Sequence, residues 1–377
     1  MVSLARASLR YEAKRFFPAA LAVAFSGLLM LVQLGLLLGM FGTVSTVIDH
    51  AKADLWVGFT GTPSFDLGRP IAVRHETALR MHPEVMAVER LIVGYADWRN
   101  PTGQPTAGML IGIDPGEESL GAPVSFTPKQ RAALVEPGAV IVDEADAGKL
   151  GARVGEIVEI NGRRARVVSL SAGFRSIGGA TIFCSLYTAS LLLGPQLADI
   201  DSATYLLVKL RDPALAESVR YALQPRGEHP PYKVWSASEF SVGSQLYWLL
   251  ESGAGAGSAF ASLLGLLVGI VITSQTLMAA LIASLREYAT LRALGVSRRR
   301  LSAVVLEQAF WIGVLGLGIS GLASIIAWMV ANAYSVGMTF TWWAVLGTGA
   351  VTLGVALGAG LLALRALAQV EPAVLLR

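Results

Sequence analysis

Four long stretches of the chain are apolar and almost free of charged residues. They cover residues 19–42, 257–283, 303–331 and 342–366. A helix needs about 20 apolar residues to cross the hydrocarbon core of a bilayer, and each stretch is long enough. The hydrophobic pattern therefore predicts four membrane-spanning helices, one before and three after a long polar segment.

The polar segment, residues 45–255, alternates short strand-like runs with helical ones. Its clearest local signal is Asn161-Gly162, a pair that favours the type I′ turn of a β-hairpin and joins two alternating runs. Asp212 is placed to cap a helix that has Pro213 at its first position. The strand-like runs are 53–59, 87–98, 107–114, 138–144 and 204–210, and the helical runs are 75–83, 143–151 and 211–223. This pattern predicts an α+β domain with two lobes.

Lysine and arginine bias in the short loops predicts the orientation of the spans. Basic residues precede the first span and fill the loop between the second and third, whereas the link 332–341 has none. Both termini are therefore expected in the cytoplasm, and 45–255 outside it. The first span could be confused with a signal peptide, but its apolar run is too long and lacks a clean cleavage site. The basic residues concerned are Arg6, Arg10, Lys14, Arg15, Arg286, Arg292, Arg298, Arg299, Arg300, Arg365 and Arg377.

The predicted fold class is an α-helical membrane protein with four transmembrane helices, one plus three, and a large α+β extracytoplasmic domain between helices one and two. Residues 1–17 suit a cytoplasmic amphipathic helix on the membrane surface, although an ordinary basic flank explains them nearly as well. The remaining divisions are 18–44 for the first span, 45–255 for the outer domain, 256–284 for the second span, 285–297 for a cytoplasmic helix, 298–331 for the third span, 332–341 for a periplasmic link, 342–366 for the fourth span and 367–377 for a cytoplasmic tail.

The charged segment SLREYATLRALGVSRRRL, residues 284–301, separates the second and third spans. Residues 285–294 are rich in helix formers, Gly295 is placed to end that helix in a left-handed cap, and Ser297 can cap the next one. The arginine triplet that follows is explained by topology alone. A short capped helix on the cytoplasmic face is shaped to dock on another protein.

Composition supports a membrane protein and excludes several other classes. The chain is 54% hydrophobic and 15% charged, with a mean hydropathy of +0.57. A net charge of +3 without a broad basic face gives no indication of nucleic-acid binding. Cys184 is the single cysteine, and the four histidines lack metal-ligand spacing. The phosphate-binding motif G-x-x-x-x-G-K-[ST] occurs nowhere in the sequence, so we expect any ATP hydrolysis on a separate subunit.

The loop REYATLRALGVSRRRL resembles the cytoplasmic loop of the ABC permeases that include the macrolide exporter, the lipoprotein-release permeases and the cell-division permease FtsX. Those proteins share one span, a large outer domain and three further spans. The tail AQVEPAVLLR is similar to the ending of that family. DLWV at 54–57 and the stretch 158–186 resemble the branch that exports heterocyst glycolipids.

The resemblance implies a permease subunit that is not itself an enzyme. It would work as a homodimer with an ABC ATPase carrying ATP and Mg²⁺, together with a periplasmic membrane-fusion adaptor and a TolC-like outer-membrane channel, in the bacterial inner membrane and among its lipids. The cargo would be a lipid, glycolipid or hydrophobic compound. The alternative is an FtsX-like regulatory permease that controls a periplasmic partner without transport. The residues implied to dock the ATPase are Arg286, Glu287, Leu291, Arg292, Ala293, Leu294, Gly295 and Ser297.

Three G-x-x-x-G pairs lie within the predicted spans, namely Gly35/Gly39, Gly265/Gly269 and Gly354/Gly358. Such pairs allow two helices to approach closely, either within one chain or across a dimer. Packing within the chain is the simpler interpretation for any single pair. Because the resemblance implies a dimer contact through the first two spans, it assigns Gly35, Gly39, Gly265 and Gly269 to that contact.

The remaining polar candidates favour structural roles. Glu307, near the inner end of the third span, is expected to pair with an arginine rather than relay protons. Asp143, Glu144 and Asp146 are expected to form a solvated helix start rather than a calcium site. The serines Ser171, Ser176 and Ser185 have no His and Asp partners at informative spacing, so a membrane-bound acyl-transfer enzyme has no support.

Overall fold

The computed structural model describes residues 13–100, 105–174, 179–194, 201–283, 297–333 and 336–368. The chain divides into two compact units. The membrane unit comprises Met1–Gly39 and Ala254–Arg377, and the extramembrane unit comprises Met40–Gly253. One helix, α2 (Ala13–Asp49), contributes residues to both units.

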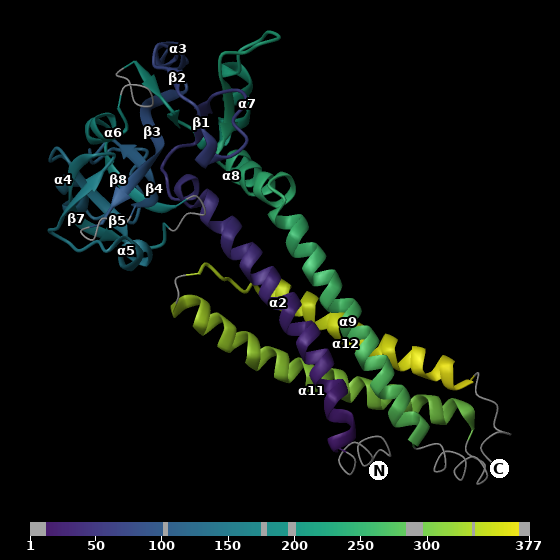
Figure 1. Ribbon diagram of the computed structural model, residues 1–377. Coiled ribbons are helices and arrows are strands. Elements are labelled where there is room, and N and C mark those ends of the chain that lie inside the picture. The colour runs from purple at the N-terminus through teal and green to yellow at the C-terminus, as the bar shows by residue number, and fades with distance from the viewer. Residues whose placement is uncertain are drawn as a thin grey trace. The chain divides into compact units, whose positions relative to one another are not determined.

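Within the described residues, the membrane unit contains four helices long and apolar enough to cross a bilayer (Figure 1), as the hydrophobic pattern predicts. α2 already begins at Ala13, so the last residues of segment 1–17 belong to the first span helix. Residues 1–12 of that segment lie outside the described residues. The other span helices are α9 (Ala254–Ala283), α11 (Arg298–Ala333) and α12 (Trp342–Ala368).

Small side chains lie where the span helices pack against one another. One buried cluster joins Ala19, Ala20 and Val23 of α2 to Ala309 of α11 and Ala356 of α12. Large aliphatic side chains point outward instead, as expected for a surface that faces lipid tails. The alanines of this cluster let the helix backbones approach, which compensates for the weak hydrophobic drive to associate within a bilayer, while Phe16, Val305 and Ile312 fill the rest of it.

The extramembrane unit is built on a nine-stranded mixed sheet with the order β11-β1-β10-β3-β4-β8-β5-β7-β6. The strands are β1 (Leu55–Gly58), β3 (Val85–Arg99), β4 (Pro105–Ile113), β5 (Ala139–Asp143), β6 (Ile157–Ile160), β7 (Arg163–Ser171), β8 (Ala180–Ser185), β10 (Tyr205–Leu210) and β11 (Lys233–Ser236), and β2 (Ile71–Ala72) pairs separately with β9 (Ser202–Ala203). The helices are α3 (His75–Arg80), α4 (Pro128–Ala133), α5 (Glu144–Leu150), α6 (Leu186–Leu193), α7 (Ala216–Leu223) and α8 (Ala237–Leu246).

The long strand β3 joins two parts of this unit. Its first half pairs with β10, its second half pairs with β4, and its end pairs with β6 through Trp98↔Ile160. The β3–β6 pairing closes β3, β4, β8, β5, β7 and β6 into a ring of strands. Figure 1 shows β4, β5, β7 and β8 with α4, α5 and α6 around them, and β1 with α3 and α7 in the other part.

Local sequence signals explain much of this unit. The hairpin turn between β6 and β7 has positive φ at Asn161 (49°) and at Gly162 (74°), which confirms the predicted type I′ turn. Asp212 caps as expected, but the element it caps is a 3₁₀ turn, Pro213–Leu215, followed by α7. The single helix predicted over 211–223 is therefore two elements.

The expectation that Asp143, Glu144 and Asp146 form a solvated helix start is also corrected by the structure. The side chain of Asp143 caps α5 by accepting a hydrogen bond from Ala145 N, and it also accepts one from Phe174 N at 2.8 Å. Asp143 is fully buried and Asp146 is nearly so. The prediction of a solvated helix start was therefore wrong at these two residues, because both side chains are buried and the loop carrying Phe174 bonds to Asp143.

Candidate functional site

The two chain segments that link the extramembrane unit to the membrane spans leave it from neighbouring strands. α2 runs into β1, and β11 runs into α8. β1 and β11 pair antiparallel, with Leu55 opposite Ser236 and Trp56 opposite Trp235. The backbone of Ala237, the first residue of α8, donates to Asp54 O at 3.1 Å. Both chain connections to the first two spans therefore leave this unit from one pair of strands.

The last turns of α2 are bonded to α8 through Ser45. Gln245 Nε2 donates to Ser45 Oγ at 2.7 Å, and Ser45 Oγ donates to Asp49 Oδ2 at 2.8 Å. Ser45 is fully buried, so the hydroxyl shared by the two bonds is shielded from water, while Asp49 is exposed. We call these two root segments, residues 40–54 and 236–251, the span roots.

α8 does not continue smoothly into α9. It passes into a π-helical turn, Tyr247–Glu251, in which Ser252 N donates to Tyr247 O at 3.1 Å. Gly253 then adopts a left-handed φ of 79°, one residue before α9 begins. π-helical turns are rare and recur at functional sites, and a left-handed residue readily ends a helix. The second root is thus irregular at its membrane end.

An aromatic cluster lies beneath the roots. Trp56 meets Phe65, Tyr205 and Phe240 at ring-centroid distances of 5.8, 5.7 and 5.7 Å. Trp235 stacks on Phe240 at 4.8 Å. Trp56 belongs to β1, Trp235 to β11 and Phe240 to α8, so the cluster packs these three elements together next to the span roots.

A buried carboxylate ties the π-helical turn to this cluster. Asp66 is 7% exposed and accepts hydrogen bonds from Ser64 Oγ at 2.5 Å and Trp248 Nε1 at 3.2 Å. Burial, and then the charge of Asp66, raises the pKa of Tyr95 to about 12. Burial likewise raises the pKa of Tyr205, whose hydroxyl donates to Phe65 O at 2.7 Å. Both phenols are therefore neutral at ordinary pH.

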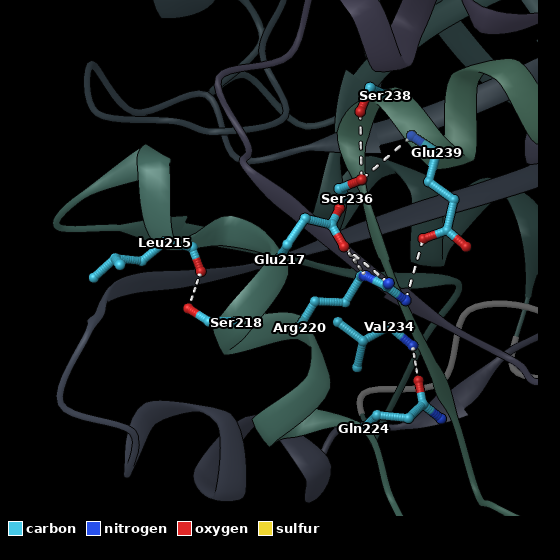
Figure 2. A network of polar contacts seen from close by, with 9 residues as sticks. All are labelled: Leu215, Glu217, Ser218, Arg220, Gln224, Val234, Ser236, Ser238 and Glu239. Atoms are coloured by element: carbon cyan, nitrogen blue, oxygen red, sulfur yellow. Dashed lines mark hydrogen bonds and ion pairs between the residues drawn. The ribbon is translucent and has the colours of Figure 1, made fainter.

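A polar network holds the start of α8 against α7 (Figure 2). Arg220 of α7 donates to Glu217 at 2.9 Å and forms an ion pair with Glu239 of α8 at 3.4 Å. Ser236 Oγ accepts from Glu239 N at 3.4 Å and so caps α8. The hydrogen bond from Arg220 is the main cause of a lowered pKa at Glu217. This network thus holds the second span root where it begins, next to β11.

A loop clasps the end of the first root. Lys52 N donates to Leu120 O at 2.9 Å, and Val124 N donates to His50 O at 3.0 Å. The loop is held by Glu89 of β3, whose carboxylate accepts from the backbone of Leu120 at 2.6 Å and from Ser119 Oγ at 2.8 Å. Burial raises the pKa of Glu89, while these donors oppose that rise.

These groups connect the span roots to the sheet through packing and hydrogen bonds. Among the residues that the structure describes, no group of three or more His, Cys, Asp or Glu side chains could hold a metal ion. Cys184 is fully buried between strands, and that burial raises the pKa of its thiol. Ser185, a candidate excluded from acyl-transfer chemistry, instead caps α6 by accepting from Thr188 N.

Most of the residues expected to dock an ATPase lie outside the described part of the chain. These are Arg286, Glu287, Leu291, Arg292, Ala293, Leu294 and Gly295. Ser297 is described, and its carbonyl accepts from Arg300 N at 3.0 Å at the start of α11. That position matches the cap predicted for the third span, while a docking role for the segment stays a prediction. Glu307 lies half-buried in α11, and its predicted arginine partner also stays a prediction.

The four glycines assigned to a dimer contact face neighbours in their own chain. A Cβ on Gly265 would overlap the side chain of Leu29, and one on Gly269 would lie 2.6 Å from Ser26 Cβ. Gly35 and Gly39 instead face the link between α11 and α12. The alternative of packing within one chain therefore holds at each of these positions, and a dimer contact through them stays a prediction. A Cβ on Gly354 or Gly358 would meet no described atom of another element within 4 Å.

The observations so far define a class, a four-span membrane protein whose first two spans are rooted in one edge of a large α/β domain. The sequence matches two protein families. Residues 16–226 match the MacB-like periplasmic core domain, and residues 259–372 match the FtsX-like permease C-terminal domain. The chain belongs to the MacB-like permeases of ABC transporters, which are inner-membrane proteins that work with an ABC ATPase.

Solved structures resemble part of the chain. The periplasmic region of MacB from Actinobacillus actinomycetemcomitans is 13% identical, covering 51% of this chain and 92% of its own, with a TM-score of 0.34. The extracellular domain of the noncanonic ABC-type transporter YknZ from Gram-positive bacteria is 15% identical, covering 49% and 99%, with a TM-score of 0.33. A domain of a putative permease from Porphyromonas gingivalis is 13% identical, covering 49% and 87%, with a TM-score of 0.31. No curated protein matches the chain.

Proposed function

We propose that this chain is the permease subunit of an ABC exporter and transmits the motion of a separate ATPase to its extramembrane unit. The observation that carries the proposal is the pairing of β1 with β11, the strands next to the two span roots, with Leu55 opposite Ser236 and Trp56 opposite Trp235. Because both membrane connections meet there, a change in the separation of the first two spans would load one hydrogen-bonded strand pair. The aromatic cluster behind it would pass that load into the sheet.

The segment 285–294 is the proposed ATPase contact. Its sequence favours a capped helix between the second and third spans, and the family works with an ABC ATPase. Closure of two ATPase subunits would move this helix and the second span, α9, which leads back to the second root. ATP and Mg²⁺ would be held by the partner, and the permease would act as a homodimer. The permease would contribute no catalytic residue.

The proposed cargo is a lipid, a glycolipid or a hydrophobic compound. The basic residues of the loops favour cytoplasmic termini, which would place residues 45–255 in the periplasm. There the unit would move cargo from the periplasm or the outer leaflet without carrying it through the spans. A membrane-fusion adaptor and a TolC-like channel would complete the path, as in the glycolipid-exporting branch that 158–186 resembles. The absence of a chain of acids along the described spans fits this better than ion-coupled transport.

A regulatory permease, which would use the same span roots to control a periplasmic partner, is the other candidate. The FtsX-like match over 259–372 is compatible with either use. The size of the outer unit, with a closed ring of strands added to the root-bearing part, favours export because it offers more surface for an adaptor. Mass spectrometry of the affinity-purified complex separates the two. Export predicts a bound lipid and an adaptor, whereas a hydrolase or kinase without lipid would favour regulation.

The coupling step is tested in nanodiscs that contain the permease and its ATPase. Leu291→Ala/Arg292→Ala, and separately Gly295→Val, should bring the permease-stimulated ATPase rate close to that of the ATPase alone. Thermal unfolding of the permease should not change, because these residues belong to neither the predicted spans nor the extramembrane unit. Arg300→Ala is the matched control, since it removes a positive charge from the first turn of α11, outside the proposed docking helix, and should preserve stimulation. Full stimulation in the Leu291, Arg292 and Gly295 variants would contradict docking through this segment.

A further inference from the structure

The link between α11 and α12 lies against the glycine-bearing face of α2. Residues 336–341 have no helix or strand of their own, and α12 starts at Trp342. Thr339 N donates to Gly35 O at 3.1 Å, so the link bonds directly to the backbone of the first span helix. Met338 is only 5% exposed although it belongs to a link between spans. We refer to residues 336–341 as the strap.

Two side chains of the strap pack against Gly35. A Cβ on Gly35 would lie 2.7 Å from the ring of Phe340 and 3.2 Å from the terminal methyl of Met338. Both distances are shorter than ordinary van der Waals contact, so Phe340 and Met338 occupy the space that a side chain at position 35 would need. These neighbours are ends of flexible side chains and could shift.

Gly39 receives the backbone of the strap. A Cβ there would lie 2.5 Å from the Gly337 carbonyl carbon, 2.8 Å from Met338 N, and closer still to the Gly337 carbonyl oxygen. Backbone atoms cannot swing aside as a side-chain end can. Any residue larger than glycine at position 39 must therefore displace the strap itself.

In the sequence around the two glycines, only positions 35 and 39 leave room for the strap to pack against the helix. The helix reads Leu34-Gly35-Leu36-Leu37-Leu38-Gly39-Met40, so every other position there carries a long side chain. One residue of axial travel along a helix is about 1.5 Å and turns the face by about 100°. Such a step would bring a leucine or Met40 to the place where the strap backbone now lies.

We propose that the strap is an intramolecular lock that fixes the axial position and rotation of α2 against the outer ends of α11 and α12. The Gly35/Gly39 pair then serves contact within the chain and not a contact with a second copy. In the ATP-driven cycle, a consequence that rests on the proposed function, α2 carries the strap with it. The first span and the outer ends of the last two therefore move together.

The lock is tested by labelling Met338→Cys with a membrane-impermeant maleimide in the full chain in nanodiscs. The native Cys184 is fully buried, and the chain without Met338→Cys measures its background. Labelling should be slow in the parent and should accelerate by about tenfold in Gly39→Ala, the change that 1.4 kcal/mol of lost closure produces. Gly42→Ala is the matched control. It lies in the same helix with nothing within 4 Å of its Cβ position and should leave labelling unchanged.

Three results would overturn the proposal. Rapid labelling of the parent would show that the strap is open. Equal slow labelling in Gly39→Ala would show that position 39 does not seat it. A loss of dimer in Gly39→Ala without faster labelling would assign Gly39 to a second copy. If Gly39→Ala does not fold, Phe340→Ala replaces it, because this change removes the ring against Gly35 and should also accelerate labelling.

The labelling experiment needs no ATPase, so its outcome is independent of the proposed function. A second arm adds the ATPase and ATP with vanadate to the Met338→Cys parent. A closed lock that travels with α2 predicts unchanged labelling. Acceleration on trapping would contradict the statement that the strap stays seated, even if export itself is confirmed.

Discussion

The bond between the two span roots can be isolated by a double-mutant cycle on Ser45 and Gln245. Ser45→Ala removes the hydroxyl that accepts from Gln245 and donates to Asp49. Gln245→Met keeps the length of the side chain but removes the donor. If the Ser45–Gln245 bond joins the roots, the two changes should not be additive. Their interaction free energy then reports this bond, because the Ser45–Asp49 bond is lost equally in the single Ser45→Ala variant and in the double variant.

The expected magnitude follows from the setting of the bond. A neutral hydrogen bond contributes about 0.5–1.5 kcal/mol net, and Ser45 is fully buried, which favours the upper half of that range. Asp49 is exposed, so its bond to Ser45 is weak for a bond to a charged acceptor. Losing that bond lowers the free energy of unfolding of the single Ser45→Ala variant only by an amount at the low end of the range for such bonds. For a domain of this size, 1 kcal/mol shifts Tm by about 2–4 °C. The sum of the Tm decreases in the two single variants should thus exceed the Tm decrease in the double variant by about 2–4 °C.

The assay is thermal unfolding of the full chain in detergent, followed by tryptophan fluorescence, for the parent, both single variants and the double variant. Gln224→Met serves as the control partner for Ser45→Ala, because Gln224 Oε1 instead accepts from Val234 N at 2.9 Å. That pair should be additive within about 0.5 kcal/mol. If the changes at Ser45 and Gln245 are also additive within about 0.5 kcal/mol, the claim that this bond joins the two roots is refuted.

Two further predictions concern the groups around the span roots. Trp248→Phe removes the donor to the buried carboxylate of Asp66, and should lower the free energy of unfolding by about 1.5–3 kcal/mol in a denaturant titration, with a smaller loss in an Asp66→Asn background. The raised pKa of Glu89 means that the folded state holds this proton more tightly than the unfolded state, so its contribution to stability is full below pH 4.5 and is lost as pH rises through the folded pKa. In Glu89→Gln this part of the pH dependence of Tm should disappear, and an unchanged slope above pH 4.5 would count against it.

Periodicity and turn chemistry predict much of the fold. The four spans follow from apolar length alone, and Asn161-Gly162 determines the register of the β6–β7 hairpin. β8 has no such signal, because Ala180–Ser185 is buried on both faces and therefore shows no alternation of polar and apolar residues. The closure of β3 onto β6 joins residues about sixty positions apart, and no local pattern encodes that register.

The candidate site, like the fold, is predicted by the sequence only in part. Spacing predicts that Gly35 and Gly39 form a surface without side chains, but it cannot say which element fills that surface. The strap that does so carries no periodic signal in the sequence. Asp143 and Asp146 show the converse error, since their charge suggested solvent, whereas the fold buries both side chains and bonds Phe174 N to Asp143. Ser45 and Gln245, two hundred residues apart, could not be paired without the structure.

The central claim is that ATP-driven movement of the spans enters the extramembrane unit through the two roots. Hydrogen–deuterium exchange of the reconstituted complex, with and without ATP and vanadate, tests it most directly. The account predicts that trapping changes the exchange of residues 40–56 and 233–251, while the ring of strands β4, β5, β7 and β8 keeps its protection. Exchange that changes in the ATPase and in the loop 284–296 but not at either root would contradict the claim.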